Sequence, residues 1–265
     1  VLGGLALGAN RLLPALQQSF TALTKIQGSR TSLHNILDTL ALPNDSYPTI
    51  EDGQKIIFED EIRFDNVWFR YQDDIDWILQ GLNLQIKSRT TVGFVGATGS
   101  GKSTTGDLIL GLLKPQKGTI WVDNKPLQGK YLRRWQQIIA HVPQNIFLAD
   151  LSIAENIAFG TPCEEINFRK VKKAARLACI DEFIQTLPAK YETFVGEQGV
   201  RLSGGQRQRI GIARALYHDA SIIIFDEATS ALDNTTEKEV MEAINSLRHD
   251  LTIILIAHRL STLER

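Results

Sequence analysis

The sequence predicts an α/β fold that is organised around one phosphate-binding loop. An antiparallel β region is expected before the loop, a helical insertion after it and one further helix at the N-terminus. Residues 96–103 match the pattern G-x-x-x-x-G-K-[S/T] at every fixed position. The runs 221–225 and 252–257 are apolar and rich in β-branched residues, which is typical of buried parallel strands. Between the loop and these runs, residues 152–187 show helical apolar spacing.

Composition is that of a globular protein. The chain has 265 residues, of which 43% are hydrophobic, so it can bury the core of one large domain or of a domain with an appendage. The net charge is −1, so no basic excess indicates binding along a nucleic-acid backbone. Cys163 and Cys179 lack metal-ligand spacing, and we expect reduced thiols that serve in packing. Because the chain begins at Val1 and its only methionine is Met241, we expect it to be a piece of a longer polypeptide.

The N-terminal segment predicts an amphipathic helix. Apolar residues recur at helical spacing over residues 16–40, and the pattern is compatible with a break near Gly28. Asn10 and Arg11 interrupt the apolar run 1–9 well short of the ~20 residues that a membrane span needs, so no complete transmembrane helix is expected. The residues alone leave two interpretations open. The segment is either the cytoplasmic end of a final membrane helix or an ordinary packing or surface helix.

Turn residues and strand patterns fill the stretch ahead of the phosphate loop. Residues 43–48 and 51–53 are polar and rich in turn formers, which indicates a linker. Residues 62–69 are strand-like, and residues 82–86 alternate between apolar and polar as a half-buried antiparallel strand does. Tyr71 follows the first of these strands. On position alone it is a core or edge aromatic, although its ring could also stack on a base.

The phosphate loop has the expected neighbours, because a predicted buried strand over residues 91–95 precedes it and a helical pattern follows it. Glycines let successive backbone N–H groups curl around an anion, and a helix that starts near Lys102 points its positive end at that anion. Lys102 would then reach the β- and γ-phosphates, and the Ser103 hydroxyl would ligate Mg²⁺. The sequence therefore predicts a P-loop NTPase core. The alternative is a Gly/Ser-rich surface turn that matches by chance.

Polar residues stand at the ends of the two apolar runs. Asp226 and Glu227 come directly after residues 221–225, and His258 comes directly after residues 252–257. Open α/β sheets place ligand groups at the carboxyl ends of their strands. Asp226 can hold Mg²⁺ through its water shell, while Glu227 can act on the water that attacks the γ-phosphate.

A second glycine pair stands ahead of another predicted helix, which begins near Arg207. Ser203 and Gln206 have capping-box spacing, and Gly204 and Gly205 leave the first-turn N–H groups uncovered. This stretch is either a second anion site or a capped helix start. A basic cluster within the helical insertion is interpreted as a solvated helix face, and it comprises Arg169, Lys170, Lys172 and Lys173.

Together these motifs resemble the nucleotide-binding domain of ATP-binding cassette (ABC) transporters, over roughly residues 60–265. Residues 202–206, Leu-Ser-Gly-Gly-Gln, match the signature motif of that family in full. The resemblance implies that Tyr71 stacks on adenine, that Gln144 contacts Mg²⁺ and the attacking water, and that His258 contacts the γ-phosphate. Residues 230–233 match the loop that crosses between subunits in the family.

The resemblance implies ATP and Mg²⁺ as ligands and assigns three sets of residues. The catalytic residues would be Lys102, Gln144, Glu227 and His258. The Mg²⁺ ligands would be Ser103, Gln144 and Asp226. The nucleotide-binding residues would be Tyr71, Gly96, Thr98, Gly99, Ser100, Gly101, Lys102, Ser103, Thr104, Gln144, Asp226, Ser203, Gly204, Gly205 and Gln206.

The resemblance also implies a domain organisation. Residues 1–42 would be the cytoplasmic end of the last transmembrane helix and residues 43–60 the linker. Residues 61–265 would be the nucleotide-binding domain, truncated at its C-terminal end, with a helical subdomain over about residues 146–205. Residues 195–199 resemble the segment that exporters place against their membrane domain. We therefore expect a transmembrane domain in the same polypeptide, a bacterial inner or plasma membrane, and this domain on its cytoplasmic side.

The function that the resemblance implies is ATP hydrolysis that powers substrate export or lipid flipping. Two copies would pair head to tail with ATP at the interface, and a homodimer is sufficient because one sequence carries both halves of a site. Residues 11–18 resemble the tail of bacterial lipid-linked oligosaccharide flippases, and the multidrug-exporter group is also open. The alternatives are a soluble, non-transport ABC ATPase that acts on nucleic acid or the ribosome, and an ATP-binding module that is inactive as an isolated fragment. The balanced charge argues against nucleic acid.

Overall fold

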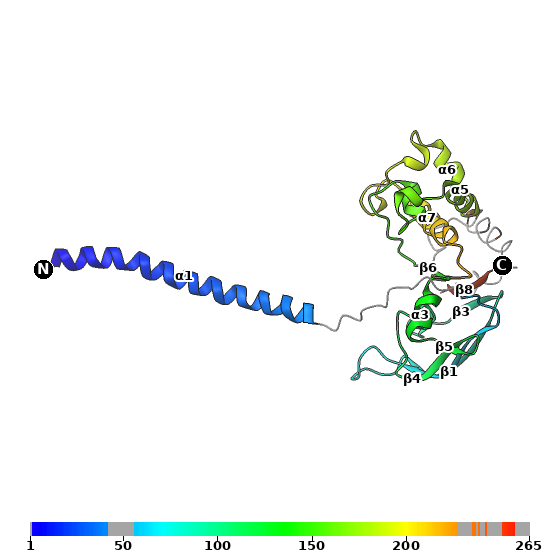
Figure 1. Cartoon of the computed structure of the whole chain (residues 1–265), viewed down its shortest axis with the longest axis horizontal. Coiled ribbons are helices and arrows are strands. Elements are labelled where there is room, and N and C mark those ends of the chain that lie inside the picture. The colour runs from blue at the N-terminus through cyan, green and yellow to red at the C-terminus, as the bar shows by residue number, and fades with distance from the viewer. Residues whose placement is uncertain are drawn as a thin grey trace. The chain divides into compact units, whose positions relative to one another are not determined.

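The computed structural model describes residues 2–41, 56–226 and 251–257, together with positions 235, 236, 238 and 242. The chain divides into two compact units, residues 1–49 and residues 50–265. The first unit holds one long helix, and the second holds two sheets and the remaining helices (Figure 1).

The described part of the first unit is helix α1 (Leu2–Ala41), which continues through Pro14 and Gly28. The break considered near Gly28 is therefore wrong. A glycine costs a helix interior only about 1 kcal/mol, and nothing lies within 4 Å of a Cβ placed on Gly28. The large apolar side chains described on α1 are 50–76% exposed. Within the described part of the chain, no helix has the length and hydropathy of a membrane span.

An antiparallel sheet of four strands opens the second unit, in the order β2-β1-β4-β5. Its strands are β1 (Glu61–Phe69), β2 (Leu79–Lys87), β4 (Lys117–Val122) and β5 (Lys125–Pro126). Along β2 the apolar residues 82, 84 and 86 are more buried than their polar neighbours, and β2 pairs antiparallel with β1. The predicted half-buried antiparallel strand is thus confirmed.

A parallel sheet of four strands carries the phosphate loop, in the order β3-β8-β7-β6. Its strands are β3 (Thr91–Val95), β6 (Ile139–Val142), β7 (Ile222–Asp226) and β8 (Thr252–Ala257). The predicted burial of β7 and β8 is confirmed, since the side chains from Ile222 to Phe225 and from Thr252 to Ile256 are at most 9% exposed. The predicted burial of β3 is wrong, because Val95 is 45% exposed. Among the described strands β3 pairs only with β8, so it lies at the edge of the sheet that the described residues form.

Two helices cover the parallel sheet near the loop. Helix α2 (Lys102–Leu110) packs on β7 and β8 so closely that a Cβ on Gly106 would lie 2.9 Å from the Cδ1 atom of Ile256. Helix α3 (Gly129–Gln136) buries Trp135, whose indole Nε1 donates to the backbone carbonyl of Ile109 at 2.7 Å. The two helices are therefore joined by packing and by one buried hydrogen bond.

The helices predicted over residues 152–187 are present as α4, α5 and α6, whereas α7 is the separate helix that was predicted to begin near Arg207; Figure 1 labels α5, α6 and α7. The helices are α4 (Ile153–Ile157), α5 (Phe168–Leu177), α6 (Asp181–Thr186) and α7 (Gly204–Tyr217). The short 3₁₀ turns are η1 (Cys163–Glu165), η2 (Lys190–Glu192) and η3 (Glu197–Gly199).

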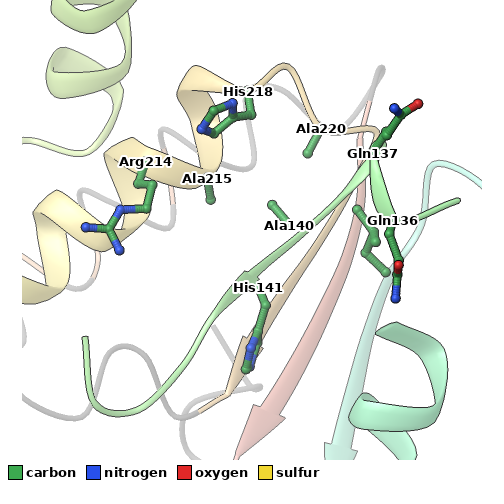
Figure 2. Close-up of a pocket in the computed structure, with 9 residues that line it drawn as sticks. Gln136, Gln137, Ala140, His141, Arg214, Ala215, His218 and Ala220 are labelled. Atoms are coloured by element: carbon green, nitrogen blue, oxygen red, sulfur yellow. The ribbon is translucent and has the colours of Figure 1, made fainter. Parts of the chain in front are cut away.

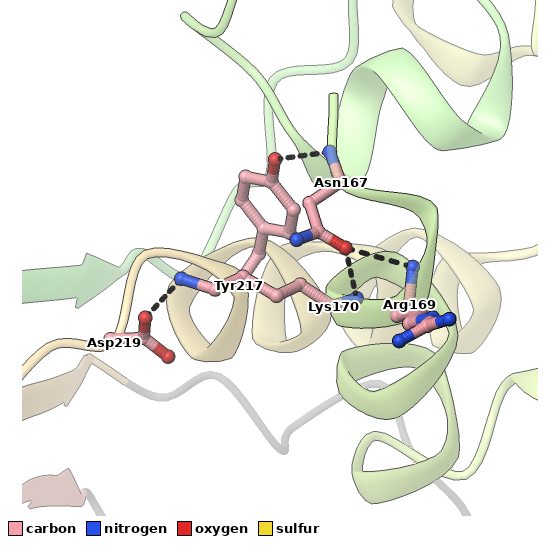
Figure 3. Close-up of polar contacts among 5 residues, drawn as sticks. All are labelled: Asn167, Arg169, Lys170, Tyr217 and Asp219. Atoms are coloured by element: carbon pink, nitrogen blue, oxygen red, sulfur yellow. Dashed lines mark hydrogen bonds and ion pairs between the residues drawn. The ribbon is translucent and has the colours of Figure 1, made fainter. Parts of the chain in front are cut away.

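The basic face of α5 is exposed, as predicted, and Lys170 pairs with Asp219 (Figure 3). The Asn167 side chain caps α5, while its backbone N–H donates to the Tyr217 hydroxyl at 3.2 Å. Neither cysteine forms a disulfide. A packing role holds for half-buried Cys179, which contacts the core, but it is wrong for Cys163, which is exposed.

The Asp123 carboxylate fixes the backbone that leads into β1. It accepts hydrogen bonds from the N–H groups of Glu59 at 3.0 Å, Asp60 at 2.8 Å and Glu61 at 3.1 Å. Asp123 lies in the turn between β4 and β5, where its φ of 46° is left-handed. The start of β1 is thereby held at the C-terminal end of β4, with which β1 pairs antiparallel.

Candidate nucleotide site

The carboxyl ends of the parallel strands meet at one edge of the sheet. Asp226 ends β7 opposite Ile256 of β8, and Ala257 ends β8 opposite Val95 of β3. The phosphate loop leaves β3 at this edge, and Gln144 follows β6 by two residues. Three of the predicted elements are therefore brought together by the parallel register. Glu227 and His258 are the next residues after β7 and β8, and they lie outside the described residues.

The phosphate loop leaves the first turn of α2 open. Gly101 is the N-cap of α2 with φ 87°, and no side chain caps this helix. A Cβ at Gly101 would lie 2.8 Å from the Leu79 Cδ2 atom, so both the backbone angle and the space require glycine. Gly99 is also left-handed, with φ 82°. A helix start with uncapped N–H groups is a site for a phosphate.

The side chains of the loop add charge and hydroxyl groups to this helix start. The Lys102 ammonium lies over the loop, where its Nζ atom donates to the carbonyls of Gly96 at 2.8 Å and Ala97 at 2.9 Å. The Ser103 side chain is exposed. Residues 96–100 are exposed as well, so an anion can reach the loop from solvent.

Tyr71 lies beside the same helix start. Its hydroxyl oxygen is 3.3 Å from the Thr104 Oγ1 atom, and its ring packs edge-on against Phe69 with the ring centroids 5.1 Å apart. The residue is nevertheless 55% exposed. The structure thus places an aromatic face in solvent next to the phosphate loop, a position that the residue's place in the sequence did not reveal.

Asp226 interacts electrostatically with two residues that the sequence analysis did not single out. Burial lowers the pKa of His141 on β6, although the nearby charges of Asp226 and Asp107 oppose this shift. Burial raises the pKa of Asp107 on α2; His141 opposes that shift and Asp226 adds to it. The strand-end carboxylate thus lies in a set of titratable groups drawn from three elements. No motif joins these residues, because they are far apart in the sequence.

The predicted Mg²⁺ ligands form a set of oxygen donors. Ser103 offers a hydroxyl, Asp226 a carboxylate and Gln144 an amide oxygen, and hard oxygen ligands suit Mg²⁺. In the described residues no three His, Cys, Asp or Glu side chains are grouped as a metal cluster. Mg²⁺ does not require such a cluster, because it usually keeps several waters and takes one or two carboxylates together with substrate phosphates. The residues present therefore fit Mg²⁺.

The segment after Gln144 is fixed to α7 by a buried asparagine and an arginine. Asn156 is fully buried, and its side chain hydrogen-bonds the backbone N–H and carbonyl of Ala149, each at 3.0 Å. Arg214 of α7 donates to the carbonyls of Asn156 at 2.9 Å and Phe147 at 3.0 Å. Burial lowers the pKa of the Arg214 guanidinium. The sequence analysis missed both residues, because each acts on backbone that no motif marks.

A cavity of about 440 Å³ lies between α7 and the β6 edge of the parallel sheet (Figure 2). Figure 2 shows Arg214 on α7 and His218 directly after the end of that helix, while the His141 side chain comes from β6. The polar residues that line the cavity are Gln136, Gln137, His141, Arg214 and His218.

The predicted signature stretch lies at the start of α7 rather than at the sheet edge. The Ser203 hydroxyl accepts from the Gln206 N–H at 3.3 Å, and the Gln206 side-chain oxygen accepts from the Ser203 N–H at 2.9 Å. This confirms the capping box. Ser203 is exposed, and Gly204 and Gly205 are partly exposed. Among the described residues, no hydrogen bond or ion pair joins this turn to the phosphate loop. Residues 230–233 lie outside the described residues.

An open helix start and a strand-end carboxylate at the carboxyl ends of one parallel sheet are typical of α/β proteins that bind nucleotide phosphates. Residues 79–230, more than half of the chain, match the sequence profile described as ABC transporter. The chain therefore belongs to the ABC transporter family.

Relatives agree with this family. An ATP-dependent lipid A-core flippase from Alkalilimnicola ehrlichii is 41% identical over 255 residues, which cover 96% of this chain and 42% of the flippase. ABC transporter B family member 29, chloroplastic, from Arabidopsis thaliana is 37% identical over 95% of this chain and 40% of its own length. The chain thus spans about two fifths of these relatives.

A solved structure of a bacterial Atm1-family ABC exporter with ATP bound matches the fold with a TM-score of 0.78 and 34% identity. The match covers 88% of this chain and 41% of the exporter chain. The predicted fold of an ABC ATPase, with an antiparallel sheet, a parallel sheet and helices, is confirmed.

Proposed function

We propose that this chain binds ATP at the sheet edge and hydrolyses it to power export or lipid flipping by a membrane protein. The observation that supports this most directly is the meeting of the phosphate loop, Asp226 and the Gln144 segment at one edge of the parallel sheet. The names of the matched relatives point to export and flipping and give no support to the alternative that acts on nucleic acid.

Each residue has a role that follows from its chemistry. The open N–H groups of α2 and the Lys102 ammonium bind the β- and γ-phosphates, and Tyr71 stacks on the adenine ring. Ser103, Gln144 and Asp226 would hold Mg²⁺. When bound, Mg²⁺ neutralises negative charge on the β- and γ-phosphates. Glu227 accepts the proton of the attacking water and, with the Gln144 amide, orients that water in line with the γ-phosphate.

The second half of the site comes from a second copy of the chain. The exposed start of α7 offers the Ser203 hydroxyl and the N–H groups of Gly204 and Gly205. In a head-to-tail pair these groups bind the γ-phosphate held by the partner's phosphate loop, whereas His258 contacts the γ-phosphate held by the phosphate loop of its own chain. Because ATP is then part of the interface, binding closes the pair and hydrolysis opens it.

The whole protein would be an exporter whose transmembrane domain belongs to the same polypeptide. Residues 1–42 form the cytoplasmic end of its last membrane helix, and residues 43–60 form the linker. Residues 61–265 form the nucleotide-binding domain, with a helical subdomain over about residues 146–205, on the cytoplasmic side of a bacterial inner membrane. The continuous α1 helix and its exposed apolar side chains support this assignment.

The test is Mg²⁺-dependent ATP hydrolysis as a function of protein concentration, with Glu227→Gln alongside. We expect the rate per molecule to rise with concentration, because each site needs two chains. Glu227→Gln should lower the rate at least about a hundredfold while ATP still binds, because the general base is lost. Glu182→Gln, an exposed glutamate on α6, is the matched control and should hydrolyse ATP normally.

Near-normal turnover in Glu227→Gln would remove that residue from the base role. A rate per molecule that does not change with concentration would argue against a site shared between two chains. ATP binding without hydrolysis at any concentration would make the isolated chain a binding module.

A further inference from the structure

The loop between β1 and β2 contacts the proposed nucleotide site at both of its ends. Tyr71 stands at its start, where the hydroxyl lies 3.3 Å from Thr104 Oγ1. Its far end packs on the phosphate loop, where a Cβ on Gly101 would lie 2.8 Å from Leu79 Cδ2 and 3.3 Å from Ile78 Cγ2. Residues 71–76 between these ends are all exposed, so their own burial does not fix the loop.

Arg70 and Trp77 close this loop. The guanidinium carbon of Arg70 lies 4.5 Å from the centroid of the Trp77 ring, and the Arg70 side chain is only 25% exposed. A cation held over an indole face is attracted to it, and more strongly where water is partly excluded. Arg70 also donates to Asp73 Oδ1 at 2.8 Å, but Asp73 is 97% exposed, so this ion pair contributes little. Of the two side-chain contacts that Arg70 makes within the loop, the ring contact is thus the stronger.

Neighbouring residues contact both Trp77 and Arg70 and hold them in place. The Trp68 ring meets Trp77 edge-on at 5.5 Å, and the Lys117 Nζ atom lies 5.3 Å from the Trp77 centroid. The Gln116 side-chain oxygen accepts from the Arg70 N–H at 3.1 Å, and its Nε2 atom donates to the Arg70 carbonyl. The backbone immediately before Tyr71 is therefore held from the start of β4.

We propose that Arg70 and Trp77 form a clip that positions Tyr71 against the nucleotide base. They are positioning residues, because they act on the base through Tyr71 and do not touch the phosphates. Without the clip the exposed loop samples more conformations, and ordering it again on binding costs affinity. This inference rests on the proposed function, since it assumes that Tyr71 stacks on adenine.

The experiment compares the affinities of the full 265-residue chain for ATP and for inorganic tripolyphosphate, both with Mg²⁺. Tripolyphosphate presents three phosphates without a base, so the ratio of the two affinities isolates the base. Tyr71→Ala should weaken ATP binding about tenfold through lost stacking. Trp77→Leu should weaken it about threefold through lost preorganisation. Both variants should bind tripolyphosphate as the wild type does.

Two further variants sharpen the comparison. Trp77→Phe keeps an aromatic face for the Arg70 guanidinium and should restore most of the ATP affinity. Trp121→Leu is the matched control, because Trp121 lies on the same sheet with the Arg63 guanidinium carbon 5.7 Å from its ring, but outside the loop. It should leave both affinities unchanged.

The outcomes distinguish a failure of the proposed clip from a failure of the proposed nucleotide site. If Tyr71→Ala weakens ATP binding and Trp77→Leu does not, the clip is overturned and the nucleotide site stands. Equal weakening of ATP and tripolyphosphate by Trp77→Leu would also overturn the clip, since the damage would then lie at the phosphate loop. A wild-type chain with no affinity for ATP would overturn the proposed function itself, and the clip with it.

Discussion

Helices α2 and α7 both begin at glycines beside small polar residues, but their first turns are capped differently. At α2 the N-cap is Gly101, and no side chain bonds to the first-turn N–H groups. At α7 the N-cap is Ser203, whose hydroxyl and backbone N–H are both paired with Gln206. The first helix thus leaves its donors for a ligand, whereas the second satisfies part of its own end. Two glycine-rich turns that look alike in the sequence therefore differ in whether a side chain caps the helix that follows.

The largest effect is expected from a substitution at Gly101, the N-cap at the open end of α2. Gly101→Ala places a Cβ in a left-handed conformation and 2.8 Å from Leu79 Cδ2. The variant should lose about 2 kcal/mol of unfolding free energy from backbone strain and crowding. ATP affinity should fall at least about tenfold, because the phosphate loop must shift to relieve the contact. Denaturant unfolding and equilibrium titration measure the two changes.

Gly129→Ala is the matched control for that substitution. Gly129 begins α3 with φ 56°, but no atom lies within 4 Å of its Cβ position. The control should lose about 1 kcal/mol of unfolding free energy and keep its ATP affinity. An equal loss of affinity in both glycine variants would mean that general destabilisation, rather than the open end of α2, governs binding.

An intermediate effect is expected from opening the capped end of α7. Ser203→Ala removes one half of the capping box and should cost about 1 kcal/mol of unfolding free energy. ATP binding to the isolated chain should stay the same, while the concentration-dependent part of hydrolysis is lost. Ser152→Ala is the control, since Ser152 caps α4 with the same pair of bonds to Glu155. It should lose stability without this loss of hydrolysis. A parallel loss in both variants would remove Ser203 from the shared site.

The smallest effect is expected at α6, where the N-cap residue offers no side-chain bond and a carboxylate stands in the first turn. Its N-cap Ile180 offers no side-chain bond, but Asp181 in the first turn accepts from the Tyr191 hydroxyl at 2.6 Å. Burial alone would raise the pKa of Asp181, but hydrogen bonds from Tyr191, Gln185 and Arg176 outweigh it and lower this pKa. Tyr191→Phe should cost about 1 kcal/mol of unfolding free energy near neutral pH.

The pH dependence of the unfolding free energy lost in Tyr191→Phe tests whether the hydrogen bond to the Asp181 carboxylate causes that loss. A lowered pKa in the folded state stabilises the protein fully above the ordinary pKa of an aspartate, and this stabilisation is lost as the pH falls through the folded value. The difference between Tyr191→Phe and the wild type should therefore narrow as the pH falls below the ordinary aspartate pKa of about 4. Tyr131→Phe is the control, because the Tyr131 hydroxyl donates to the Val122 carbonyl, which does not titrate. Its cost should stay constant over the same range.

The sequence was sufficient for features that are encoded locally. The phosphate loop, the buried strand that delivers Asp226 and the capping box at Ser203 each depend on residues within a few positions of one another. The sequence was insufficient for contacts between residues that lie far apart in the chain. Tyr71 reaches Thr104 from 33 residues away, and no pattern in either segment encodes that contact.

The prediction that β3 is buried failed for the same reason. An apolar run predicts a strand, but whether that strand lies in the middle or at the edge depends on partners elsewhere in the chain. The groups around Asp226 likewise come from β6 and α2, which no single motif spans. The roles of Glu227 and His258 stay predictions, since both residues lie outside the described ranges.

The Asp123 carboxylate, which holds three successive N–H groups ahead of and at the start of β1, has a mechanical consequence. A pull on the chain before residue 58 is shared by these three hydrogen bonds to one side chain and by the bond from the Ser88 hydroxyl to the carbonyl of buried Phe58 at 3.3 Å. Strand β1 lies between β2 and β4, so it would otherwise peel from its neighbours one pair at a time, beginning at Glu61. With the anchor in place, tension along the chain is passed to the β4–β5 turn before it can unzip the sheet.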